Sequence, residues 1–190
     1  MPRSRRFLIA PSLARLLRKE RGVEGRIVEG HFPGQYGRTH FVSFEPGHAY
    51  LVLTNPDAPG GTAEERTEVP RAHAEALLDV CSGRIGFERT KLQLRPGCEV
   101  VLSRFLQPAG LDVLTVVFEE GQDAEPLSVP AWFGPEVSED PAWARHSIAI
   151  KGATHVPDVP LTDAALDELL NMLDGSARNL PRASWPASSV

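Results

Sequence analysis

The sequence predicts an α+β fold, namely an eight-stranded antiparallel β-barrel with flanking helices and a C-terminal amphipathic helix. Most of the chain consists of short β-branched or aromatic segments separated by Gly- and Pro-containing turns, a pattern typical of antiparallel strands. Three stretches carry apolar residues at helical spacing instead. Because short turns join most of the expected strands, a closed or nearly closed barrel is the expected arrangement.

The helical stretches have recognisable starts and stops. The first places Leu13, Leu16 and Leu17 on one face and stops at Gly22, and the last begins at a Thr162 N-cap. Helices are expected at residues 11–22, 71–80 and 161–175, and strands at 5–10, 25–32, 38–45, 49–54, 65–70, 84–94, 98–106 and 111–120.

Length and composition indicate one globular domain. A chain of 190 residues, 42% of them hydrophobic, can bury one core. We expect this domain over residues 1–175 and a poorly ordered, mostly small and polar tail over 176–190. The apolar run near the start is interrupted by Pro11, and no segment reaches the length of a membrane span. A cytoplasmic protein without a membrane partner is therefore expected.

The charge is unevenly distributed along the chain. The formal net charge of -5 disfavours a nucleic-acid partner, yet residues 1–26 hold eight Lys or Arg against two Glu. This basic segment is either a solvated face or part of an anion site.

The cysteines and histidines do not form a metal-binding motif. Cys81 and Cys98 form no CxxC pair, and the six histidines lack metal-binding spacing. We therefore expect reduced thiols and no metal site built from these residues.

The stretch PAWFGPEVSEDPAWARHSIA at residues 130–149 resembles the C-terminal segment of the CYTH family, the triphosphate tunnel proteins. Four further segments resemble the family in its order, namely RRFLIA at 5–10, VEGHF at 28–32, AYLVLTNP at 49–56 and AEALLDVC at 74–81. The resemblance implies a tunnel lined with charged side chains. In the family, acidic residues hold divalent metal, Arg and Lys hold a triphosphate, and the reactions are triphosphate hydrolysis or cyclisation of ATP.

Most of the family's tunnel charges are absent from the matching positions. Its N-terminal Glu-x-Glu-x-Lys falls on Pro2, Ser4 and Arg6, which keeps one cation and loses both carboxylates. Phe41 and Phe87 stand where the family has cations, so we expect a drier and narrower cavity. The degenerate family positions are Ser4, Phe41, Ser43, Thr54, Phe87, Ser103, Thr115 and Val117.

Some charges remain at the tunnel positions. The family's Glu-x-Glu-x-Glu falls on Glu64, Arg66 and Glu68, a combination that favours an internal ion pair over a metal site. The next strand keeps Arg89, with Lys91 following on the same face. The tunnel candidates for ligand binding are therefore Arg6, Glu64, Arg66, Glu68, Arg89 and Lys91.

A one-residue slip in strand register would exchange the inner and outer faces of a strand. Such a slip would turn Val42 and Phe44 inward on one strand, and Leu114 and Val116 on another. Neither slip restores an arginine or a carboxylate. The loss of the family's charges therefore does not depend on the register assumed.

These residues predict a CYTH-like protein that binds a small anionic or phosphate-containing ligand without metal or with altered chemistry. A hard divalent cation needs about six oxygen ligands, so no metal cofactor is expected and no catalytic residue is assigned. In a competing interpretation, the cations pair internally with Glu64, Glu68 and Glu99, and no ligand binds.

Two other functions stay open. The first is an active metal-dependent triphosphate hydrolase or an adenylate-cyclase-like enzyme, which would require Mg or Mn. The second is a non-catalytic interaction module that uses the basic helix at 12–22 and the tail with Trp185 to bind a protein partner.

Overall fold

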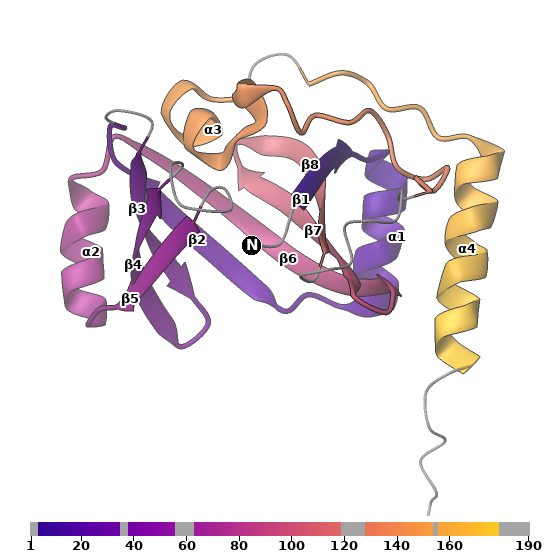
Figure 1. Cartoon of the computed structure of the whole chain (residues 1–190), viewed down its shortest axis with the longest axis horizontal. Coiled ribbons are helices and arrows are strands. Elements are labelled where there is room, and N and C mark those ends of the chain that lie inside the picture. The colour runs from indigo at the N-terminus through magenta and orange to yellow at the C-terminus, as the bar shows by residue number, and fades with distance from the viewer. Residues whose placement is uncertain (1–3, 35–37, 56–62, 119–127, 154–155, 179–190) are drawn as a thin grey trace, which may run out of the picture.

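The computed structural model describes residues 4–34, 38–55, 63–118, 128–153 and 156–178 (Figure 1). These residues form one eight-stranded sheet with helices around it, so the predicted α+β class is confirmed. The elements are β1 (Ser4–Leu8), α1 (Pro11–Arg21), β2 (Gly25–His31), β3 (Thr39–Glu45), β4 (His48–Asn55), β5 (Ala63–Glu68), α2 (Arg71–Asp79), β6 (Gly83–Arg95), β7 (Cys98–Gln107), β8 (Ala109–Phe118), the 3₁₀ helix η1 (Pro141–Trp143), α3 (Arg145–Lys151) and α4 (Asp163–Arg178).

The strands are hydrogen-bonded in the order β1-β8-β7-β6-β2-β3-β4-β5, and every neighbouring pair is antiparallel. The two ends of this order, β1 and β5, form no ladder with each other in the described part of the chain. The sheet is therefore a nearly closed barrel and not a strictly closed one, and an inner face and an outer face remain distinct along every strand.

The free edge of β1 is covered by the segment that follows β8. The Leu8 N–H donates to the Pro135 carbonyl over 2.9 Å, and the Val137 N–H donates to the Arg6 carbonyl over 2.8 Å. In addition, two hydrogen bonds from the Arg5 guanidinium lower the pKa of Glu136 to about 2. This explains why a segment rich in Pro and aromatic residues lies late in the chain, since it covers an edge that would otherwise leave backbone groups unpaired.

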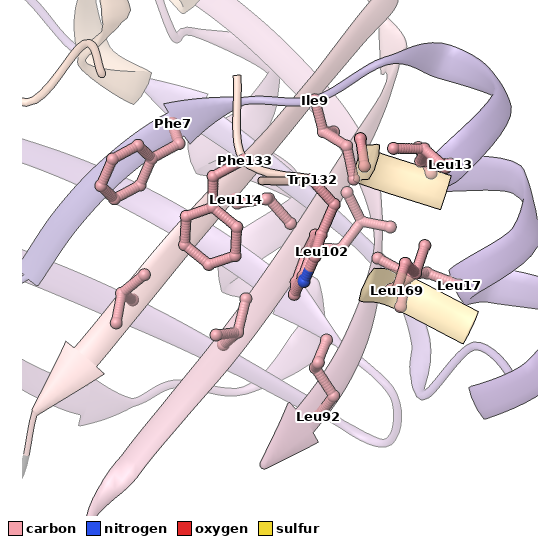
Figure 2. Packing of buried hydrophobic residues seen from close by; sticks show 14 of the residues in the cluster. Phe7, Ile9, Leu13, Leu17, Leu92, Leu102, Leu114, Trp132, Phe133 and Leu169 are labelled. Atoms are coloured by element: carbon pink, nitrogen blue, oxygen red, sulfur yellow. The ribbon is translucent and has the colours of Figure 1, made fainter. Parts of the chain in front are cut away.

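The largest apolar core lies on the outer face of the sheet (Figure 2). Leu102 of β7 and Leu114 of β8 point outward and are fully buried beneath α1, which contributes Leu13 and Leu17. Trp132, from the segment that follows β8, is buried in the same cluster. The two-residue period of the strands places these leucines on the helix side and leaves the alternate residues for the interior.

Two other helices are positioned by close packing against the sheet. Ala74 of α2 packs against Val42 and Ala49, which are outward-facing residues of β3 and β4. A Cβ atom at Gly83 would lie 2.0 Å from the Ala149 carbonyl oxygen, so glycine is required for α3 to approach β6 this closely. In Figure 1, α3 lies over one end of the sheet, while α2 and the α1–α4 pair lie at opposite sides.

The helical elements differ from the prediction at the C-terminal end. The helix expected to stop at Gly175 continues to Arg178, because one glycine inside a helix costs only about 1 kcal/mol and nothing after it breaks the helix. The sequence patterns did not indicate η1 or α3, which are too short to show a clear period. The tail beyond residue 178, including Trp185, lies outside the described residues. No helix in the described part of the chain has the length and apolar character to cross a membrane.

We predict that α4 unfolds together with the sheet. Leu169 is fully buried in the outer core, whereas its neighbour Leu170 is 41% exposed. The substitution Leu169→Ala should lower the free energy of unfolding by about 2–5 kcal/mol, since it removes buried methyl groups and leaves a cavity. Leu170→Ala, the matched control, should change it by less than about 0.5 kcal/mol. Urea denaturation followed by circular dichroism measures both values, and an equal effect of the two substitutions would contradict the prediction.

Candidate functional site

The inner face of the sheet surrounds a cavity of about 560 Å³. All eight strands contribute to its wall, and residues 143–146 around the start of α3 contribute as well. The lining residues are Ser4, Arg6, Ile27, Glu29, Thr39, Phe41, Glu45, Thr54, Glu64, Arg66, Phe87, Arg89, Val101, Ser103, Phe105, Val113, Thr115, Trp143, Ala144, Arg145 and His146.

Most of the tunnel positions taken from the family resemblance lie on this wall. Those that line the cavity are Ser4, Arg6, Phe41, Thr54, Glu64, Arg66, Phe87, Arg89, Ser103 and Thr115. Ser43, Glu68, Lys91 and Val117 are not among the lining residues. The alternate residues Val42 of β3 and Leu114 of β8 pack in the outer clusters. Both strands therefore have the register assumed in the sequence analysis, without a one-residue shift. Phe41 and Phe87 are buried in the wall, and the cavity volume remains beside them.

Arg6 has an unusual environment for a half-buried cation. Its Nη1 donates to the Trp143 carbonyl and its Nη2 to the Ser138 carbonyl, each over 2.9 Å. Among the described residues, Arg6 forms no ion pair with a carboxylate. Burial lowers the pKa of the Arg6 guanidinium, and the positive charge of Arg145 lowers it further. The carboxylates of Glu139 and Asp140 raise it in part, but neither forms an ion pair with Arg6. A fixed guanidinium that no carboxylate of the described residues contacts therefore faces the cavity.

Arg145, whose side chain is partly exposed, contacts a buried polar pair formed by Glu29 and His31. One oxygen of the Glu29 carboxylate accepts from Arg145 Nη1, and the other lies 2.9 Å from His31 Nε2. Burial alone would raise the pKa of Glu29, but the charge of Arg145 and the contact with His31 outweigh burial and lower it. The Glu29 carboxylate in turn raises the pKa of Arg145. Because both Glu29 and Arg145 line the cavity, this pair forms part of its wall.

His146 follows Arg145 on the same wall. The ring of His146 lies edge-on to that of His31, with a centroid distance of 5.7 Å. Burial lowers the pKa of His146, and neighbouring basic groups lower it further. The imidazole of His146 is therefore neutral at pH 7 and adds no charge to the cavity.

The ion pair expected within β5 does not form. Arg66 does not pair with Glu64 or Glu68. Its side chain crosses the Tyr50 ring at 4.6 Å and forms an ion pair with Glu45 of β3. Side chains two residues apart on a strand project in parallel, so a long arginine reaches a partner across the sheet more easily than its own strand neighbours.

The other candidate charges also have partners. Glu64 lies 3.6 Å from Arg145, and Arg89 lies 3.0 Å from Glu24, a residue that precedes β2. Lys91 lies 3.6 Å from Glu99, and neither residue lines the cavity. Glu68 faces His48, away from the cavity lining. Of the four arginines that line the cavity, Arg6 alone contacts no carboxylate among the residues that the structure describes.

The arrangement does not fit the divalent cation that the family resemblance implies. The carboxylates that line the cavity, Glu29, Glu45 and Glu64, each lie against an arginine. Within the described ranges, no group of three or more His, Cys, Asp or Glu side chains is placed to hold a metal ion. A carboxylate that accepts from a guanidinium has fewer lone pairs left for a metal, and the adjacent positive charge repels the metal.

Sequence reasoning missed four ionisable residues of this wall, Glu29, Glu45, Arg145 and His146. Glu29 could have been found, because it alternates with Ile27 on the inward face of β2. Arg145 and His146 lie at the start of a seven-residue helix. No strand period could have assigned them to the cavity.

Comparisons with known proteins place the fold but not the chemistry. A scan against protein-family models gives no match, and neither does a search of curated proteins. Solved structures do match. Two structures of NE1496, one described as a hypothetical protein and one as an inorganic triphosphatase, give TM-scores of 0.57 and 0.56 at 18% and 19% identity. They cover 83% of this chain and 100% and 97% of their own.

A conserved hypothetical protein from Pyrococcus furiosus matches with a TM-score of 0.50 at 12% identity, over 65% of this chain and 82% of its own. The eight-stranded antiparallel sheet with its inner cavity, together with these matches, defines a tunnel-type fold. The chain has the CYTH-like fold that residues 130–149 indicated.

We predict that the Glu29–Arg145 pair contributes to stability in a pH-dependent way. Glu29→Gln removes a buried carboxylate that accepts hydrogen bonds from a partly exposed guanidinium and a histidine, which should lower the free energy of unfolding by about 1–3 kcal/mol at pH 7. Because the pKa of Glu29 is lowered on folding, its contribution is complete above the ordinary value of 4.5 and is lost as the pH falls further.

The measurement is urea denaturation of the wild type and the variant at pH 7, 5, 4 and 3. The difference between them should be largest at pH 7 and shrink below about pH 4.5. Glu65→Gln, at an exposed position of β5, is the control and should have little effect. A difference that is constant from pH 7 to pH 3 would show that the charge of Glu29 does not contribute in this way.

Proposed function

We propose that this protein binds a small anionic ligand in the cavity without a metal ion, and that it is not a metal-dependent triphosphatase. The observation that carries the proposal is the environment of Arg6, a cavity-lining arginine bonded to two carbonyl groups. A half-buried charge is costly when no opposite charge contacts it. An anionic ligand would supply that contact.

The hydrogen bonds of Arg6 support this proposal. A guanidinium has five N–H groups, and the two carbonyl acceptors engage only part of them. The bonds fix the plane of the guanidinium, so the remaining N–H groups are already oriented. Arginine in such a fixed geometry is suited to carboxylate or phosphate oxygens. Arg145 lies close enough to lower the pKa of Arg6, but Glu29 and Glu64 offset its own charge, so Arg6 is the cation available to the anion.

A metal-dependent triphosphate hydrolase is the second candidate, because one structural match is described as an inorganic triphosphatase. Such chemistry uses bound metal ions to neutralise phosphate charge. In this chain the three cavity carboxylates that could serve as ligands contact arginines instead. We therefore favour metal-free binding and assign no reaction.

The first test is a thermal-shift screen against tripolyphosphate, ATP, pyrophosphate, sulfate and carboxylates, each with and without Mg²⁺ or Mn²⁺. We expect at least one anion to raise the melting temperature without metal. At one hundred times the Kd, a ligand stabilises by about 2.7 kcal/mol, which corresponds to roughly 5–10 °C for a chain of this size.

Two variants locate the binding site. Arg6→Gln should abolish the shift, whereas Arg26→Gln, which removes an exposed arginine next to the cavity residue Ile27, should preserve it. A shift that requires metal would favour the hydrolase instead. If no anion gave a shift, the proposal would be wrong, and a protein-interaction role would become the leading interpretation.

A further inference from the structure

The wall of the cavity has an apolar part that the proposed anion site does not use. Ile27, Phe87, Val101, Phe105 and Val113 come from four consecutive strands of the sheet, and we call them the apolar wall. The rings of Phe87 and Phe105 lie with their centroids 5.5 Å apart. A polyanion gains nothing from such a surface, whereas the apolar body of an organic ligand would be removed from water by it.

The charges around the cavity limit what kind of anion fits. Arg66 is paired with Glu45, Arg145 contacts both Glu29 and Glu64, and Arg89 contacts Glu24. Arg6 is thus the one lining arginine that no carboxylate of the described residues contacts, although Glu139 and Asp140 act on its charge without forming an ion pair. Four carboxylates, Glu24, Glu29, Glu45 and Glu64, already offset the charges of the four lining arginines, so Arg6 can pair with one added carboxylate and no second lining cation in the described part of the chain is free for a further negative charge. A tripolyphosphate would bring several charges into a space with few free cations, at a large desolvation cost.

The positive charge and the apolar wall lie within reach of one small molecule. Arg6 of β1 is paired in register with Thr115 of β8, and Thr115 is paired with Val101 of β7. Because neighbouring strands are about 4.8 Å apart, the backbones at Arg6 and Val101 are separated by roughly 10 Å. The cavity volume of about 560 Å³ lies in the range of sites for small organic ligands.

We infer that the ligand is a hydrophobic monocarboxylate, whose carboxylate meets Arg6 and whose apolar body lies against the apolar wall. This inference rests on the proposed function, since it names the class of anion that the same site takes. It differs from that proposal in requiring an apolar body of substantial size.

The experiment is isothermal titration calorimetry with the full chain and a series of straight-chain carboxylates from acetate to decanoate at pH 7. Burial of a methylene is worth about 0.8 kcal/mol, so the affinity should rise about fourfold for each added CH₂ until the cavity is filled. The heat capacity change of binding should become more negative along the series. Octanamide, which has the same chain without the charge, should bind at least tenfold more weakly than octanoate.

Arg6→Met should lower the affinity for octanoate at least tenfold and leave that for octanamide nearly unchanged. Arg26→Gln should alter neither affinity. The ligand series on the wild type provides the decisive comparison and does not depend on the folding of any variant.

Each alternative result has a distinct meaning. If sulfate, phosphate and acetate bind as tightly as octanoate, the anion site stands and the hydrophobic monocarboxylate is wrong. If a phosphomonoester of the same chain length binds more tightly than octanoate, the assignment of a singly charged carboxylate is wrong. If octanamide binds as tightly as octanoate, or if no anion binds at all, both the proposed function and this inference are wrong.

Discussion

Each strand of this sheet has to satisfy two different environments, because three helices cover the outer face while the inner face surrounds a cavity. Leu114 and Thr115 show the constraint on one strand. The leucine is fully buried beneath α1 and the threonine lines the cavity. A shift of one residue would exchange them and place a polar hydroxyl beneath the helix. The outer apolar core therefore fixes the register, and the register decides which side chains face the cavity.

The charges of the cavity follow from the cost of removing ions from water. A charge on the inner face has to find a partner, and most of the partners come from a different element. Glu29 of β2 meets Arg145 of α3, a residue 116 positions later in the chain. Arg66 of β5 reaches Glu45 of β3 by crossing Tyr50. These pairs use the carboxylates that a metal would need, so ion pairing and metal binding compete for the same groups.

The sequence was sufficient to predict the features that local patterns determine, namely which strand residues face inward and where a helix forms. The family resemblance placed Phe41, Phe87 and Thr115 on the inner face, and all three line the cavity. The helical period found α1 because Leu13 and Leu17 form one apolar face. Which charges pair could not be predicted, since this depends on distances across the sheet that no local pattern contains. Arg66 illustrates this point, because its strand neighbours Glu64 and Glu68 were the obvious partners and it binds neither of them.

Arg145 could not be placed from the sequence because its position is set by α3. That helix packs closely against Gly83 of β6, and the sequence alone does not reveal this contact. The position of Arg6 follows from the same late segment of the chain. Backbone hydrogen bonds attach residues 134–137 to the free edge of β1, and the carbonyls of Ser138 and Trp143 then hold the Arg6 guanidinium. The segment that closes the sheet edge is thus also the segment that orients the cation. A guanidinium held in this way loses less conformational entropy when it binds an anion than a mobile arginine would. The feature of the sequence that most clearly indicated the fold is therefore also the feature that prepares the cavity for a ligand.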